Sequence, residues 1–97
     1  MATPIRITTV QADLVWEDAA ANLAQLESKL AGADVMVISC AKLIRVDFSA
    51  AGTLLNWVSA RHAENRTVQF SEVNRLVAAF FNVIGITEYA KVTTRSD

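Results

Sequence analysis

The stretch that decides the fold is VMVISCAKLIRVDFSAAGTLLNWV, residues 35–58. Residues 35–40 form an apolar run rich in β-branched side chains, which is typical of a strand buried on both faces by helices. Residues 41–46 are then expected to loop back toward the sheet. After Asp47 the chain continues with a serine and small residues, followed by apolar residues at helical spacing, Ala51, Leu54, Leu55 and Val58. The stretch therefore predicts a buried strand, a loop and a helix.

The N-terminal segment shows the same alternation of strand and helix. Residues 5–10 are rich in Ile, Thr and Val and predict a strand, which ends there or continues to Val15. Asp18 predicts the N-cap of a following helix, and Gly32 predicts its end. The apolar residues of this helix recur at spacings of three and four: Ala19, Leu23, Leu26 and Leu30.

The C-terminal half continues the alternation. Residues 67–73 predict a strand, Asn74 the N-cap of a third helix, and Gly85 the left-handed residue that follows it. The residues expected on the inner face of this helix are Leu76, Val77, Phe80 and Ile84. Residues 89–94 predict a last edge strand. This order predicts an α/β fold in which a mostly parallel sheet of four to five strands alternates with helices.

Length and charge restrict the classes of function. A chain of 97 residues supports one domain with one core, so residues 1–97 are expected to form a single domain. The formal net charge is −1 and the basic residues are scattered, which disfavours binding to nucleic acid or to an anionic membrane. Residues 1–9 lack the features of an export signal, and no apolar run approaches the ~20 residues needed to span a bilayer. We therefore expect a cytoplasmic protein that does not insert into the membrane.

The sequence offers little material for catalysis. Cys40 is the only cysteine and lies in an apolar strand, where we expect it to be buried and unreactive. His62 is the only histidine and is expected to be an ordinary helix residue. Neither GxxxxGK[ST] nor GxGxxG occurs, so a nucleotide-binding domain is the weakest of the functions considered. We expect a protein that is not an enzyme and that binds neither a metal nor a cofactor.

The large aromatic residues allow two interpretations. Four of them fall outside the clearest core stripes: Trp16, Trp57, Phe81 and Tyr89. Aromatic side chains in such positions either mark a contact surface or fill the edge of a small core.

Ser49 also allows two interpretations. Its hydroxyl can cap the helix by accepting a hydrogen bond from the backbone N–H of Ala51 or Gly52. The same helix start has unpaired N–H groups and a partial positive charge, which would accommodate a phosphate on this serine. Among proteins in general a serine at such a position is usually a cap, and both interpretations remain open here.

The chain resembles the STAS domain family over about residues 5–92. The resemblance is carried by residues 35–58 and by VQFSEVNRLVAAFFNVIGI, residues 68–86, which matches the family's next strand and helix. It implies a small bacterial module that acts by protein–protein contact in the cytoplasm. The chain ends soon after Val92, so the family's C-terminal helix is expected to be short or absent. A sheet face left uncovered in this way would favour a homodimer or a permanent partner.

The first function that the resemblance implies is that of one branch of the family, the anti-sigma factor antagonists. In that branch a kinase-like anti-sigma factor binds the unmodified domain and phosphorylates a serine or threonine at this helix start. By position, Ser49 matches the phosphoacceptor and Asp47 the acid two residues before it. The resemblance implies partner switching, because a phosphate beside Asp47 would place unpaired charge in the contact. Phe48 and Ala50 stand where this branch has a second hydroxyl and a glycine.

The alternative function is that of a second branch, the small STAS subunit of the Mla lipid-transport system. Its Val-Asp-Thr-Gly-Gly and Gly-Val-Asn segments resemble residues 46–50 and 72–74, with Phe48 in place of the hydroxyl. In that branch the domain binds the ATPase of an ABC transporter without phosphorylation. Both branches imply the same partner-binding residues: Asp47, Phe48, Ser49, Ala50, Thr53, Asn56 and Trp57.

Overall fold

Four parallel strands form the main sheet of the computed structural model, which describes residues 5–11, 15–16 and 19–95. Their spatial order follows the chain: β1 (Ile7–Gln11), β3 (Val35–Ser39), β5 (Thr67–Val73) and β6 (Ala90–Thr94). The helices of the described part alternate with them: α1 (Ala19–Lys29), α2 (Ala51–Ala63) and α3 (Arg75–Ile84). The predicted α/β class with a parallel sheet is confirmed.

A second sheet consists of two very short parallel strands, β2 (Val15–Trp16) and β4 (Arg45–Val46). Val15 therefore does not prolong the first strand, as one sequence prediction had it, but belongs to another sheet. The segment 41–46 ends in β4, which lies beside α3. The predicted N-cap Asp18 lies outside the described residues.

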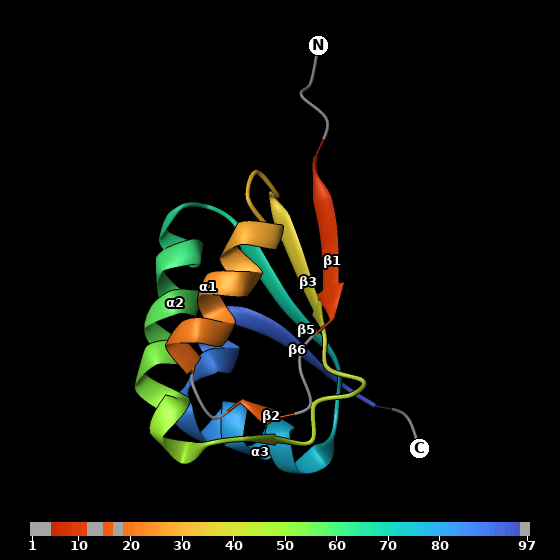
Figure 1. Cartoon of the computed structure of the whole chain (residues 1–97), viewed down its shortest axis with the longest axis vertical. Helices are drawn as coiled ribbons and strands as arrows, with labels where there is room; N and C mark the ends of the chain where they lie inside the picture. Colours follow the sequence, from red (N-terminus) through yellow and green to blue (C-terminus); the bar gives the residue numbers. More distant parts are fainter. Residues whose placement is uncertain (1–4, 12–14, 17–18, 96–97) are drawn as a thin grey trace.

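All three helices lie on one side of the main sheet (Figure 1). Each crossover leads to the adjacent strand, and crossovers between parallel strands are right-handed, so every helix returns over the same face. In β3 the side chains of Met36 and Ile38 are fully buried, whereas Val35 and Val37 on the other face are only half-buried. The prediction that this strand is buried on both faces is therefore wrong.

The core fills the space between the helices and the covered face of the sheet. Phe81 is fully buried, with its ring centroid 5.0 Å from that of Phe70, although the sequence placed it outside the core stripe. Leu76, predicted to point inward, is 74% exposed. The other fully or almost fully buried residues of the three helices are Leu23, Leu26, Leu54, Val58 and Val77.

The contacts at the start of α3 explain how the helix is rotated. Asn74 Oδ1 accepts the backbone N–H of Val77 at 2.8 Å, which confirms the predicted N-cap. Its amide nitrogen also donates to the carbonyl oxygen of Leu43 at 3.0 Å, which attaches the helix start to the loop before β4. Gly85, with a φ of 90°, follows the last residue of α3 as predicted.

The described part of the chain contains no helix with the length and apolar character that a membrane crossing requires. No helix follows β6 as far as Arg95.

Candidate docking site

Asp47 organises the junction between β4 and α2. Its Oδ1 atom accepts the backbone N–H of Ser49 at 3.0 Å and the hydroxyl of the same serine at 2.9 Å. The carbonyl oxygen of Asp47 accepts the N–H of Ala50 at 2.9 Å, and residues Phe48–Ala50 form a 3-10 turn. The backbone and hydroxyl bonds from Ser49 lower the pKa of Asp47, with a further contribution from Arg45. Asp47 is thus a carboxylate at neutral pH.

Ser49 does not cap α2 in the way that the sequence predicted. Its hydroxyl donates to Asp47 instead of accepting from Ala51 or Gly52. The N-cap position belongs to Ala50, which has no side-chain cap bond. The extra 3-10 turn places the start of α2 after the serine, and Asp47 receives the donors of that turn. The Ser49 side chain remains exposed.

The structure divides the predicted partner-binding residues. Asp47, Ser49, Thr53 and Asn56 are exposed on the junction and on the first turns of α2. Ala50 is only 3% exposed, so its side chain is a core residue and leaves the predicted set. Phe48 begins the 3-10 turn. The exposed residues of the predicted set, together with Gly52 beside them, are called the docking surface below: Asp47, Ser49, Gly52, Thr53 and Asn56.

Trp57 is partly buried and connects two helices. Its Nε1–H donates to Glu27 Oε2 at 2.8 Å, and the same oxygen accepts a bond from Arg61. The Arg61 guanidinium lies 5.5 Å from the Trp57 ring centroid, a cation–π arrangement. Trp57 therefore attaches α2 to α1. It also lines a groove of about 300 Å³ whose other residues include Leu23, Ala24 and Thr53, next to the docking surface.

Gly52 is the residue of this site that sequence reasoning missed. It is exposed in the first turn of α2 and is not among the glycines with a positive φ. A Cβ atom added there would meet nothing within 4 Å. Glycine lowers helix stability, so neither backbone conformation nor internal packing explains its presence. Gly32 and Gly85 have positive φ values that favour glycine, whereas Gly52 does not. This difference in backbone conformation is visible in the folded chain and not in the sequence.

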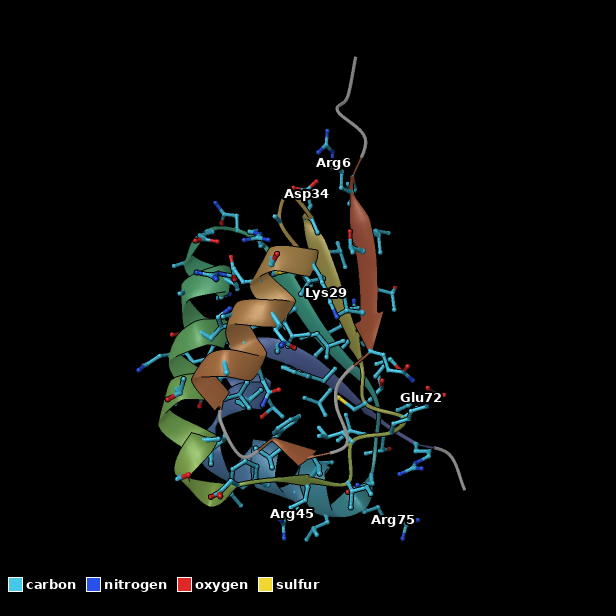
Figure 2. All side chains as sticks on the ribbon, viewed as in Figure 1. Arg6, Lys29, Asp34, Arg45, Glu72 and Arg75 are labelled. Carbon is cyan, nitrogen blue, oxygen red and sulfur yellow. The ribbon has the colours of Figure 1, made fainter. Side chains whose placement is uncertain are left out.

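A second groove, also missed by the sequence, lies on the other side of the junction. It measures about 190 Å³ and is lined by Arg45, Val46, Leu76, Val77 and Phe80. Ile44 and Leu76 are 61% and 74% exposed in this region. Figure 2 shows the side chains of Arg45 and Arg75 pointing outward at the same end of the molecule. The junction is therefore flanked by an apolar groove with cationic groups at its border.

Cys40 and His62 are the other residues whose side chains the sequence analysis considered for chemistry. Cys40 is fully buried, and burial raises the pKa of its thiol to about 12, so the thiol is protonated at neutral pH. His62 is exposed, with its ring 5.6 Å from that of Tyr89. Within the described ranges, no three residues among His, Cys, Asp and Glu are grouped to hold a metal ion. The junction and the first turns of α2 present hydroxyl, amide and carboxylate side chains at the surface.

The comparison with protein families gives one match. A family model described as "Mlab, STAS domain" matches residues 7–93, from the first residue of β1 into β6. This chain belongs to the STAS domain family. No curated protein and no solved structure gave a significant match. The matched part of this STAS domain includes the entire docking surface and both grooves.

Proposed function

We propose that this STAS domain is a protein-docking module whose partner binds the docking surface at the start of α2. The observation that carries the proposal is Gly52. A glycine that the fold itself does not need leaves the first turn of α2 without a side chain, and this allows the backbone of a partner to approach closely. The exposed Asp47, Thr53 and Asn56 around it supply hydrogen-bonding groups for the rim of such a contact.

The partner class that we favour is the cytoplasmic ATPase of an ABC lipid transporter. Two observations support this choice over a sigma-factor switch. The matched family carries Mlab in its description, and residues 46–50 resemble the corresponding segment of the Mla subunit. Phe48 and Ala50 stand where both branches have a hydroxyl residue and a glycine, so these two positions do not separate the two functions. The proposal places the protein in the cytoplasm as a constitutive accessory subunit.

Binding between the purified domain and the transporter ATPase of the same organism tests this proposal. Biolayer interferometry gives the dissociation constant. Thr53→Arg should weaken binding by at least about tenfold, because it places a long charged side chain in the middle of the contact. Gln25→Arg makes the same charge change on the exposed surface of α1 and should leave binding unchanged. Absence of binding, or an equal loss in both variants, would contradict the proposal.

Gly52→Ala separates stability from function. In the isolated domain the substitution should raise the free energy of unfolding by about 0.5–1 kcal/mol, because alanine favours a helix and its Cβ meets no neighbour. The same methyl group should weaken the partner complex. Urea denaturation measures the first effect and interferometry the second. A variant that is more stable and binds as well as the wild type would remove Gly52 from the contact.

A second candidate function, the phosphorylation switch of an anti-sigma factor antagonist, rests on the Ser49 hydroxyl. It is exposed and held by Asp47 at 2.9 Å. A phosphate would replace this donor and bring nearly two negative charges beside an ionised carboxylate, which would oppose docking of a kinase-like partner. Intact-mass spectrometry with site mapping on protein from its own cells tests the idea. A phosphate on Ser49, with loss of partner binding in Ser49→Asp but not in Ser49→Ala, is the expected result. An unmodified Ser49 under all growth conditions would exclude the switch.

A further inference from the structure

The outer edge of β1 is unpaired in the described part of the chain. Its only strand partner there is β3, and Figure 1 shows no element beyond it. The carbonyl oxygen of Arg6 accepts the N–H of Val35 at 3.0 Å and therefore faces β3. Backbone groups alternate between the two edges of a strand, so the N–H and C=O groups of Ile7, Thr9 and Gln11 point away from the sheet.

The two edges of the sheet differ in chemistry. β6 carries Lys91 within the strand, and charged residues of this kind discourage pairing of an edge with another chain. β1 has the sequence ITTVQ, which contains strand-forming residues and neither a charge nor a proline. Ile7 on this edge is 66% exposed. Of the two edges, β1 is the one whose composition permits pairing.

We propose that two copies of this chain pair through β1 as antiparallel strands and extend the two sheets into one. The two-fold axis passes at Thr9, the middle one of the three outward-facing residues. Thr9 then lies opposite Thr9 of the second copy, and Ile7 lies opposite Gln11 of the second copy. All three are hydrogen-bonded positions of an antiparallel pair, so every outward N–H and C=O group of β1 finds a partner.

The side chains are compatible with this register. Ile7, Thr9 and Gln11 all lie on the open face of the sheet, where opposed threonines form a favourable cross-strand pair. β1 carries no charged residue, so the pairing brings no like charges together. In Figure 1, β1 and α2 lie on opposite sides of the molecule, so the dimer leaves both docking surfaces accessible. The inference is independent of the proposed function.

Sedimentation velocity over protein concentrations from about 10 µM to 1 mM tests the dimer, because an edge contact this small predicts weak association. Thr9→Lys and Thr9→Glu each place like charges opposite one another at the axis, and each should weaken association by at least about tenfold. An equimolar mixture of the two variants should dimerise again through a Lys–Glu pair. Thr94→Lys, on the exposed surface of β6, serves as the matched control and should dimerise like the wild type. Circular dichroism checks that each variant is folded.

Three outcomes would overturn the proposal. The first is a wild-type chain that stays monomeric over the whole concentration range. The second is a dimer that Thr9→Lys does not weaken, or that the mixture of charge variants does not restore. The third is a dimer that Val37→Lys abolishes while Thr9→Lys preserves it. Val37 lies in the middle of the open face, so that result would assign the contact to stacked sheet faces.

Discussion

Glu72 adopts a left-handed backbone conformation within β5, with a φ of 55°. It lies where the register between β5 and β6 shifts, between Phe70 and Val73, which is the position of a bulge. A left-handed conformation costs a residue with a Cβ atom about 1–2 kcal/mol. The Mla segment that residues 72–74 resemble has glycine at this position. A glycine at position 72 of this chain would adopt the same conformation without that cost.

Glu72→Gly should raise the free energy of unfolding by about 0.5–1 kcal/mol, because relief of the strain exceeds the entropy lost on ordering a glycine. Urea denaturation at neutral pH measures the change. Glu72→Ala removes the same charge but keeps the Cβ atom, so it should give little or no gain. Equal gains in the two variants would assign the effect to the carboxylate rather than to the backbone.

The pKa of Asp47 is a measure of the hydrogen bonds that Ser49 donates to it at the junction. Because folding lowers this pKa, the ionised carboxylate contributes stability above the ordinary value of about 3.9, and the contribution is lost as the pH falls through the lowered value. Ser49→Ala removes the hydroxyl bond and keeps the backbone bond, so the pKa of Asp47 should rise only part of the way. An NMR titration of the Asp47 carboxyl carbon between about pH 2 and 6 measures it. An unchanged pKa would mean that the hydroxyl does not contact Asp47 in solution.

Elements whose signals are local could be predicted from the sequence, and those set by distant contacts could not. Asn74 and Gly85 bound α3 through their own backbone and side-chain preferences. The rotation of α3, which exposes Leu76 and buries Phe81, depends on packing against Phe70 and on the bond to the loop before β4. Strands β2 and β4 have two residues each, too few to show any periodicity.

Arg66 connects the end of α2 to the end of α1. Its Nε and Nη2 atoms donate to the carbonyl oxygens of Ala33 and Leu30, each at 3.0 Å. Arg66→Ala should lower the free energy of unfolding by about 1–3 kcal/mol, because the carbonyl of Ala33 loses its donor and that of Leu30 keeps only the backbone N–H of Ala33. Arg75→Ala is the control: Arg75 is exposed, so its replacement should change stability by less than about 0.5 kcal/mol. Similar losses in thermal or urea unfolding would show that Arg66 does not fasten the two helices.

The helices of the described chain cover only one face of the main sheet, and no single segment of the sequence predicts this arrangement. The run at residues 35–40 is apolar on both faces, yet only one face is covered, because the strand order directs every crossover to the same side. The candidate site shows the same limit. The sequence placed Asp47 and Ser49 together at the helix start but predicted a cap bond for the serine that does not form, and the burial of Ala50 and the Trp57–Glu27 bond depend on tertiary packing.

Met36 and Val37 are neighbours in β3 that lie on opposite faces of the sheet, so substitutions at the two positions compare the packing of the two faces. Met36 is fully buried under the helices, so Met36→Thr should cost about 2–5 kcal/mol through lost packing and a buried hydroxyl. Val37 lies half-buried on the open face, so Val37→Thr, which keeps the side-chain shape, should cost less than about 1 kcal/mol. Urea denaturation of the isolated domain measures both changes. A large cost at both positions would mean that the second face is also covered in solution, as it would be if two copies stacked their sheets. A large cost at Met36 alone would place all the core packing on the helix side and leave the open face solvated.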